Sequence, residues 1–300
     1  MFELRPDRLA TLYFFRPLGR LFGRVAPGVP ILMYHSIQEP ESIGGPYYET
    51  STSPAVFTRH MKFLSDHGYT AMTLDRAIRS LGKAHGEARP VVLTFDDGCR
   101  SFCSTAVPII QRFGFAATVF LIAGLTGERR HRFHGQECMT WAEVREVQGC
   151  GMSIGSHTMT HPELASMKRC AIDEELGRSK QIIEDSVGTP VTSFSYPFAF
   201  PEADHALVAY LEDALRRHGY ENGVSTVIGT AGPADSRYFL PRIPVNTWDD
   251  LRLFQAKLEG GYDWLHVPQS LYKNLRRRTG TLQRFIGRRE PRSSGSGLAG

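Results

Sequence analysis

The sequence predicts an α/β fold in which parallel strands form a barrel covered by helices. Seven or eight short apolar runs alternate with segments of helical character along the 300 residues. The runs are almost continuously apolar, as expected for strands that are buried on both faces of a parallel sheet. Reactive side chains follow several different runs. Barrel enzymes place such residues at strand C-termini around a ring, whereas a doubly wound sheet gathers them at one crevice.

Apolar runs rich in β-branched residues mark the expected strands, and capping residues mark the helices between them. The strands are expected at 29–35, 69–74, 91–95, 115–122, 152–155, 191–196, 222–228 and 238–245. Ser53 before Pro54, Asp75, and a capping box of Thr140 and Glu143 are helix starts. We expect helices at 53–67, from 75, at 104–113, from 140, at 168–187, at 203–218, and after residues 247 and 268. Residues 39–53, 82–90 and 124–138 are expected loops.

Length and composition fit one large folded domain with basic ends. Hydrophobic residues make up 41% of the chain and charged residues 22%, which excludes disorder over most of its length. We expect a basic N-terminal segment at 1–27, a catalytic domain at 28–270 and a basic, partly disordered tail at 271–300. The net charge of +4 is therefore concentrated at the two ends.

The cysteines and the N-terminal residues indicate the cellular compartment in which the protein is expected. The five cysteines are odd in number and include no CxxC pair, which indicates reduced thiols inside a cell. The apolar run at 9–15 is short and is followed by Arg16, so we expect neither a secretory signal nor a spanning helix. Alternating arginines and apolar residues fit a helix on an anionic membrane surface or a solvated helix packed on the domain. We expect a cytoplasmic protein that is peripheral at the inner membrane face.

Two carboxylates and two imidazoles form the candidate reaction centre. Asp96 and Asp97 end the run at 91–95, where adjacent carboxylates need a nearby cation to offset repulsion and lost hydration. His157 and His161 follow the run at 152–155 at a spacing of four residues. One Asp and two His are a common ligand set for a catalytic divalent metal, which leaves the second Asp free to act as a base. On their own, the carboxylates also fit a solvated turn or a helix cap.

Two of these motifs resemble those of a known family. Thr-Phe-Asp-Asp-Gly at 94–98 and His-Thr-Met-Thr-His at 157–161 are similar to the first two motifs of the polysaccharide deacetylases (carbohydrate esterase family 4, or NodB homology domain). Thr-Trp-x-Glu at 140–143 also matches in order. The resemblance covers roughly residues 28–245. It is closest to poly-N-acetylglucosamine deacetylases, some of which look circularly permuted, and it implies a single-domain, distorted (β/α)7-type barrel.

The resemblance also implies roles for individual residues. It makes Asp97, His157 and His161 the ligands of one divalent metal, with Zn2+ favoured and Co2+, Ni2+ or Mn2+ compatible. The metal would polarise an amide carbonyl and lower the pKa of water, and Asp96 would be the general base. A positioned base is worth roughly 10²–10⁴ in rate. His35, which ends the run at 29–35, is our candidate for the general acid that protonates the leaving amine.

The third family motif departs from its usual Arg-x-Pro-aromatic pattern. It reads Ser-Tyr-Pro-Phe at 195–198, so Ser195 stands where the arginine that normally steadies the base is expected. The resemblance makes the backbone N–H of Phe198 the oxyanion donor, because Pro197 has no N–H. Arg242, which follows a late proline, is our candidate replacement for the missing arginine. The alternative for Arg242 is a structural or surface ion pair.

Together these features predict a hydrolase that removes an N-acetyl group from an N-acetylated sugar of a polysaccharide or glycan precursor. The expected partner is that glycan, with membrane contact through the basic termini and no nucleic acid. Two alternatives stay open. One is hydrolysis of a non-sugar amide or cyclic imide, which the loss of the motif arginine favours. The other is a non-catalytic glycan-binding protein of the same fold.

Overall fold

Seven parallel strands close into a barrel in the computed structural model, which describes residues 5–21, 28–40, 49–79 and 89–269. Around the ring the order is β1 (Ile31–Tyr34), β12 (Leu240–Pro244), β11 (Asn222–Ile228), β10 (Ser193–Ser195), β9 (Ser153–Ser156), β6 (Thr118–Leu121) and β5 (Arg89–Phe95). Pairing of β5 with β1 closes the ring. The predicted single-domain (β/α)7-type barrel is therefore confirmed.

An eighth strand, β4 (Tyr69–Met72), lies outside the ring. It pairs with the start of β5, whereas β6 pairs with the end of β5. Two further pairs are short: β2 (Ser36–Ile37) with β3 (Ser51–Thr52), and the hairpin of β7 (Arg132–Phe133) and β8 (Gln136–Glu137). The hairpin falls within the expected loop at 124–138.

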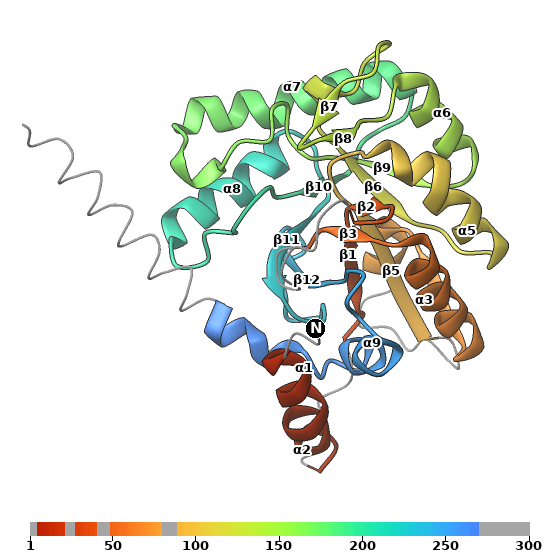
Figure 1. Ribbon diagram of the computed structural model, residues 1–300. Coiled ribbons are helices and arrows are strands. Elements are labelled where there is room, and N and C mark those ends of the chain that lie inside the picture. Colours follow the sequence, from red (N-terminus) through yellow and green to blue (C-terminus); the bar gives the residue numbers. More distant parts are fainter. Residues whose placement is uncertain (1–4, 22–27, 41–48, 80–88, 270–300) are drawn as a thin grey trace, which may run out of the picture.

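Helices form a layer around the strands (Figure 1). They are α3 (Pro54–Asp66), α4 (Leu74–Ile78), α5 (Val107–Arg112), α6 (Trp141–Gly149), α7 (Arg169–Val187), α8 (His205–Arg217) and α9 (Leu251–Leu258). Short helical turns lie at η2 (Phe102–Ala106), η3 (Ala123–Leu125), η4 (Leu164–Ser166) and η5 (Asp263–Leu265). Because η2 runs directly into α5, helical structure begins slightly before the expected residue 104. The expected helix after residue 268 falls largely outside the described residues.

Two helix starts follow the expected capping chemistry. Ser53 Oγ accepts a hydrogen bond from Val56 N at the start of α3. The reciprocal bonds of Thr140 and Glu143 form the capping box of α6. These caps satisfy N–H groups that have no partner within the helix.

The expected cap at Asp75 is wrong. Helix α4 begins one residue earlier, at Leu74, and Thr73 is the residue at its N-cap. The Asp75 carboxylate instead accepts hydrogen bonds from polar side chains at or beside the N-terminal ends of β9, β10 and β11: Ser153, Thr192, Ser193 and Asn222. Asp75 therefore closes the end of the barrel opposite to the candidate reaction centre.

A glycine in β9 permits close packing inside the barrel. A Cβ at Gly155 would lie 2.4 Å from the ring of Phe120, which is fully buried in β6, and 3.0 Å from Ser193 O. No larger residue fits without displacing these neighbours. The strand that leads into His157 is therefore fixed in position by packing on both sides.

The N-terminal segment is helical and packs on the barrel beside α9. It consists of α1 (Pro6–Ala10), a π-type turn η1 (Thr11–Phe15) and α2 (Arg16–Leu21). Within the described residues no helix is both long and apolar enough to cross a membrane. All five cysteines are free. The expected tail at 271–300 lies outside the described residues, and the domain boundaries stay predictions.

Candidate active site

Three side chains with metal-ligand chemistry meet at the C-terminal ends of the strands. Asp97 follows β5, and His157 and His161 follow β9. The Nε2 atoms of His157 and His161 each lie 3.5 Å from Asp97 Oδ1. Ligand atoms of all three residues lie within 4.8 Å of one another. Tetrahedral ligands at about 2.0–2.1 Å from an ion are separated by about 3.3 Å, so the three side chains can share one cation.

The hydrogen bonding of Asp97 and His157 also fits a cation. Asp97 Oδ1 is buried and has no hydrogen-bond partner among the residues that the structure describes, an arrangement that is costly for a carboxylate oxygen. His157 Nδ1 lies 2.8 Å from the backbone oxygen of Ser195. Because a carbonyl can only accept, Nδ1 carries the proton and the Nε2 lone pair is directed toward Asp97. A divalent cation would satisfy both Oδ1 and Nε2.

His161 is held as a neutral imidazole between two aromatic rings. Burial, together with neighbouring His157, lowers the pKa of His161 to about 4. The ring centroids of Phe133 and Phe198 lie 4.9 Å and 4.8 Å from that of His161. The neutral form is the one that binds metals.

The second carboxylate of the pair is engaged by Arg242 from β12. The guanidinium Nη1 and Nη2 donate to Asp96 Oδ1 and Oδ2 at 2.8 Å and 2.7 Å, and all of these atoms are buried. Ser195 Oγ donates to Asp96 Oδ1 at 3.1 Å. Burial alone would raise the pKa of Asp96, but the charge of Arg242 and the proximity of His157 outweigh it and hold that pKa well below its ordinary value. Asp96 is therefore ionised.

His35 and Phe198 lie at the same edge of the barrel. Tyr34 O accepts a hydrogen bond from Asp96 N, so His35 and Asp96 leave adjacent strands side by side. His35 is half-buried and contributes to lowering the pKa of Asp96. Phe198 is half-exposed, and among the described residues no oxygen accepts a hydrogen bond from its N–H.

Backbone strain is concentrated at this edge. Five non-glycine residues have positive φ in the described parts of the chain, and four of them belong to the site. They are Asp97 (67°), Thr158 (67°), His161 (58°) and Phe198 (57°). Such conformations cost of the order of 1–3 kcal/mol each and persist where the surroundings enforce them, commonly at functional sites.

Glu175, which was not among the residues predicted from the sequence, fixes the turn that carries His161. Its buried carboxylate on α7 accepts hydrogen bonds from Met159 N (2.8 Å), Thr160 N (2.9 Å) and Thr160 Oγ1 (2.7 Å). Within the turn, His161 N donates to Thr158 Oγ1 at 2.9 Å. The buried face of α7 includes Ile172, Leu176, Ser179 and Ile183. In the sequence, the signal for Glu175 was an acidic residue at a helix position whose neighbours on the same face are mostly apolar.

Comparison with known proteins identifies the family. The polysaccharide deacetylase family model matches residues 83–222. YxkH of Bacillus subtilis, which carries a polysaccharide deacetylase name, is 31% identical over 235 residues, covering 77% of this chain and 76% of that protein. The chain belongs to the polysaccharide deacetylase family. It is accordingly a carbohydrate deacetylase, a hydrolase.

Two further similarities place this deacetylase within the family. The Staphylococcus aureus poly-β-1,6-N-acetyl-D-glucosamine N-deacetylase is 23% identical over 205 residues, covering 65% of this chain and 68% of that protein. The solved structure of the Streptococcus pyogenes deacetylase PplD in complex with acetate aligns with a TM-score of 0.67 at 25% identity. That alignment covers 78% of this chain and 99% of PplD. The predicted family, barrel and enzyme class are confirmed, and the roles of individual residues stay predictions.

Proposed function

We propose that this deacetylase removes N-acetyl groups from sugar units of a polysaccharide or glycan precursor with the help of one divalent cation. The observation that carries the proposal is the cluster of Asp97, His157 and His161 beside the ion-paired carboxylate of Asp96. The resemblance to a poly-β-1,6-N-acetyl-D-glucosamine N-deacetylase supports an N-acetylated sugar as the substrate unit.

Asp97, His157 and His161 would hold the cation. Mixed nitrogen and oxygen ligands favour Zn2+, and Co2+, Ni2+ and Mn2+ are compatible with them. When bound, the cation supplies Lewis acidity, which polarises the acetyl carbonyl and makes water more acidic.

Asp96 acts as the general base in this proposal. As the oxygen of water attacks the acetyl carbon, the ionised carboxylate of Asp96 takes the proton that the water loses. The two hydrogen bonds from Arg242 and the one from Ser195 fix the plane of the carboxylate. Orientation of the base lowers the entropic part of the barrier.

Phe198 and His35 complete the reaction. The free N–H of Phe198 donates to the oxyanion that forms on the former carbonyl oxygen. Breaking the C–N bond then needs a proton on the sugar nitrogen, and His35 supplies it from the side of the site next to Asp96. The products are acetate and a free amino sugar.

Acetate release from soluble oligosaccharides tests the function. The full chain, reloaded with Zn2+, is incubated with β-1,6-linked and β-1,4-linked N-acetylglucosamine oligomers, and acetate and free amine are measured together. We expect the two products in equal amounts, with Asp96→Asn slower by at least about 10²-fold. Hydrolysis of simple amides or cyclic imides with no release from any N-acetylated glycan would instead favour a non-sugar substrate.

A further inference from the structure

The N-terminal helical segment has its polarity reversed relative to an ordinary surface helix. The side chains that it buries against the domain are polar: Arg5, Asp7 and Thr11. The side chains that it exposes are large and apolar, with Tyr13 64% and Phe14 74% exposed. A helix on a globular protein normally turns its apolar side to the core and its polar side to water.

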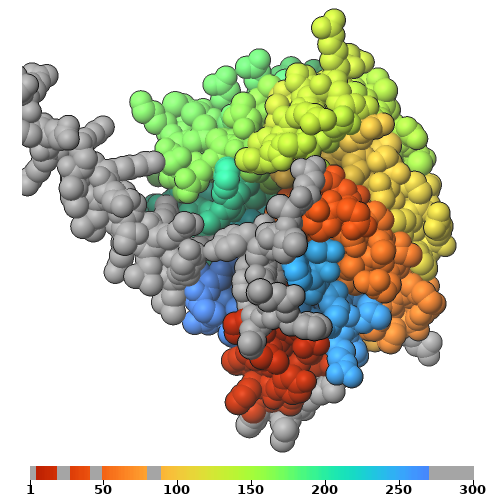
Figure 2. Space-filling model, in the orientation of Figure 1, coloured from red at the N-terminus to blue at the C-terminus, as the bar shows by residue number. Residues whose placement is uncertain are grey.

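The exposed side of this segment carries more large hydrophobic side chains than any other surface in the described part of the protein. Of the eight large hydrophobic side chains that are exposed there, five lie within residues 9–18. Phe15 packs against Trp264, and we call the other four the outer apolar face: Leu9, Tyr13, Phe14 and Leu18. In the space-filling view the N-terminal segment projects at the edge of the molecule (Figure 2). Clustered exposed apolar side chains mark an interaction surface, whereas scattered ones do not.

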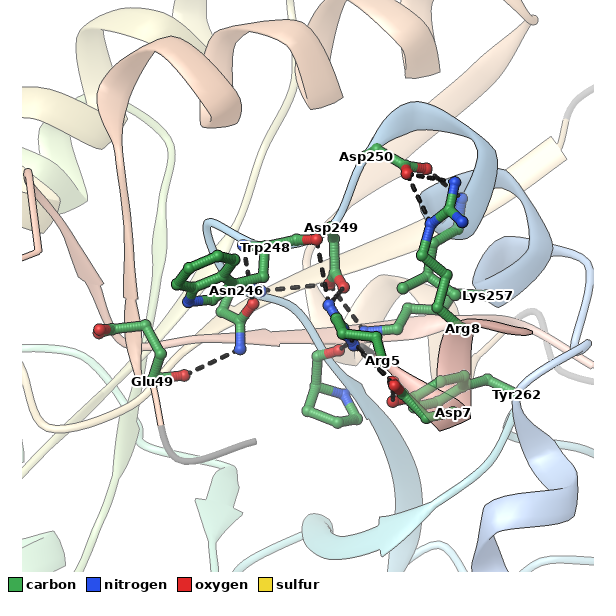
Figure 3. A network of polar contacts seen from close by, with 12 residues as sticks. Arg5, Asp7, Arg8, Glu49, Asn246, Trp248, Asp249, Asp250, Lys257 and Tyr262 are labelled. Carbon is green, nitrogen blue, oxygen red and sulfur yellow. Dashed lines mark hydrogen bonds and ion pairs between the residues drawn. The ribbon is translucent and has the colours of Figure 1, made fainter. Parts of the chain in front are cut away.

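Buried polar contacts prevent the segment from turning this face inward. Arg5 pairs with Asp7 and, at 3.2 Å, with Asp249, which also pairs with Lys257 at 2.7 Å (Figure 3). Tyr262 Oη donates to Asp7 at 2.7 Å. Because removing one member of such a network leaves a buried charge without its partner, the helix is fixed in this orientation.

Contacts farther along the segment hold it in the same way. Trp264 Nε1 donates to Thr11 Oγ1 at 3.0 Å, and its ring stacks on Phe15 with centroids 4.4 Å apart. Arg8 and Arg16 pair with Asp250 and Glu259. The two arginines thus lie on the side of the segment that faces the domain. The outer apolar face points away from the domain and is available to a binding partner.

We propose that the outer apolar face inserts into the interfacial layer of a bilayer that contains anionic lipid. Its aromatic and aliphatic side chains suit the boundary between head groups and acyl chains. The helix is short and lies along the domain, which fits shallow insertion and not a span.

The charge of the chain favours lipid over another protein surface. Past Gln269, which lies just beyond Trp264, the sequence carries eight cationic residues against the single acidic residue Glu290. The cationic residues are Lys273, Arg276, Arg277, Arg278, Arg284, Arg288, Arg289 and Arg292. A polybasic segment attracts anionic lipid, and together with an apolar face it gives the two signals that stable peripheral binding requires.

Vesicle flotation with the full chain tests the proposal. We expect binding to vesicles of phosphatidylglycerol and phosphatidylcholine, weaker binding to phosphatidylcholine alone, and weakening as salt rises from about 0.1 M to about 1 M. The triple variant Tyr13→Ser, Phe14→Ser, Leu18→Ser should bind more than about tenfold more weakly. The matched control Tyr13→Leu, Phe14→Leu keeps the face apolar and should bind within a few-fold of wild type. Acetate release from soluble oligosaccharides should be unchanged in both, because the substitutions lie outside the candidate active site.

Three outcomes would overturn the proposal. Absence of wild-type binding to anionic vesicles is the first. Equal binding by wild type and the serine variant is the second, because the contact would then lie elsewhere. The third is a wild-type dimer in sedimentation velocity that the serine variant breaks without any vesicle binding, which would make the outer apolar face an interface between copies of this chain.

Discussion

Arg242 and Asp96 lie 146 residues apart in the sequence and form a buried, bidentate ion pair, with N–O distances of 2.8 Å and 2.7 Å. Arg242 comes from β12 and Asp96 from the end of β5, with β1 between these strands in the sheet. Ser195, which stands where the family motif has its arginine, donates to the same carboxylate. An arginine from a different strand therefore meets the carboxylate that we propose as the base.

This geometry predicts the behaviour of Arg242 variants. Arg242→Ala would leave the Asp96 carboxylate buried without its partner, which should cost about 3–5 kcal/mol of unfolding free energy and at least about 10²-fold in kcat. Metal content should be retained, because Arg242 contacts none of the three candidate ligands. The double variant Ser195→Arg, Arg242→Ala restores an arginine at the motif position and should recover part of the activity. If Arg242→Lys kept the wild-type kcat, catalysis would not require the bidentate pairing of residue 242 with Asp96.

Glu175 should affect the metal through the turn at 158–161. Glu175→Gln keeps one acceptor oxygen and loses charge, and Glu175→Ala removes all three hydrogen bonds to the turn. We expect weaker Zn2+ binding by roughly tenfold for Gln and more for Ala, measured by competition with a chelating dye. The matched control is Glu174→Gln on the same helix, whose exposed side chain should leave Zn2+ affinity unchanged. Unaltered affinity in Glu175→Ala would show that the turn holds its shape without this carboxylate.

His60 should make stability depend on pH. Burial lowers the pKa of His60 to about 4, against an ordinary value of 6.5. The unfolded chain therefore binds a proton between these values while the folded chain does not, so stability is full above pH 6.5 and is lost as pH falls toward 4. Between pH 7 and pH 5 this group alone should lower the unfolding free energy by about 2 kcal/mol.

Urea unfolding at the two pH values measures this effect. His60→Gln should reduce the difference by about 2 kcal/mol and leave the part that comes from His161, whose pKa burial also lowers to about 4. His205→Gln, at an exposed position on α8, should leave the difference unchanged. Equal pH dependence in wild type and His60→Gln would rule out His60 as its source.

Gly155 gives a test of the packing that positions His157. Gly155→Ala would bring a Cβ to 2.4 Å from the buried ring of Phe120, so we expect a loss of about 1–3 kcal/mol and weaker metal retention. Gly149→Ala is the matched control, because its Cβ would meet nothing within 4 Å. Thermal unfolding of both variants, followed by elemental analysis, separates the two effects. A Gly155→Ala protein as stable as wild type would mean that β9 and β6 can move apart.

The barrel and the proximity of the three candidate metal ligands were predictable because their signals are local. Apolar runs followed by polar residues mark the C-terminal ends of parallel strands, and those ends meet at one edge of the sheet. Asp97, His157 and His161 belong to two compact motifs of this kind, and the structure brings them together.

Other features depend on contacts that one sequence does not encode locally. The pairing of Arg242 with Asp96 was one of two interpretations, because nothing near Arg242 indicates which carboxylate it meets. Asp75 was misassigned because a helix cap and a carboxylate at the closed end of a barrel look alike in sequence. The reversed polarity of the N-terminal segment follows from its partners on the domain, above all Asp249 and Trp264.

The metal site of Asp97, His157 and His161 is tested most directly by the metal content of the purified protein, measured by elemental analysis for wild type beside His157→Ala. We expect about one divalent ion per wild-type chain, its loss in the variant, and the loss of acetate release with it. Acetate release by a wild-type protein that stays free of metal after reloading with Zn2+, Co2+ or Ni2+ would contradict this expectation.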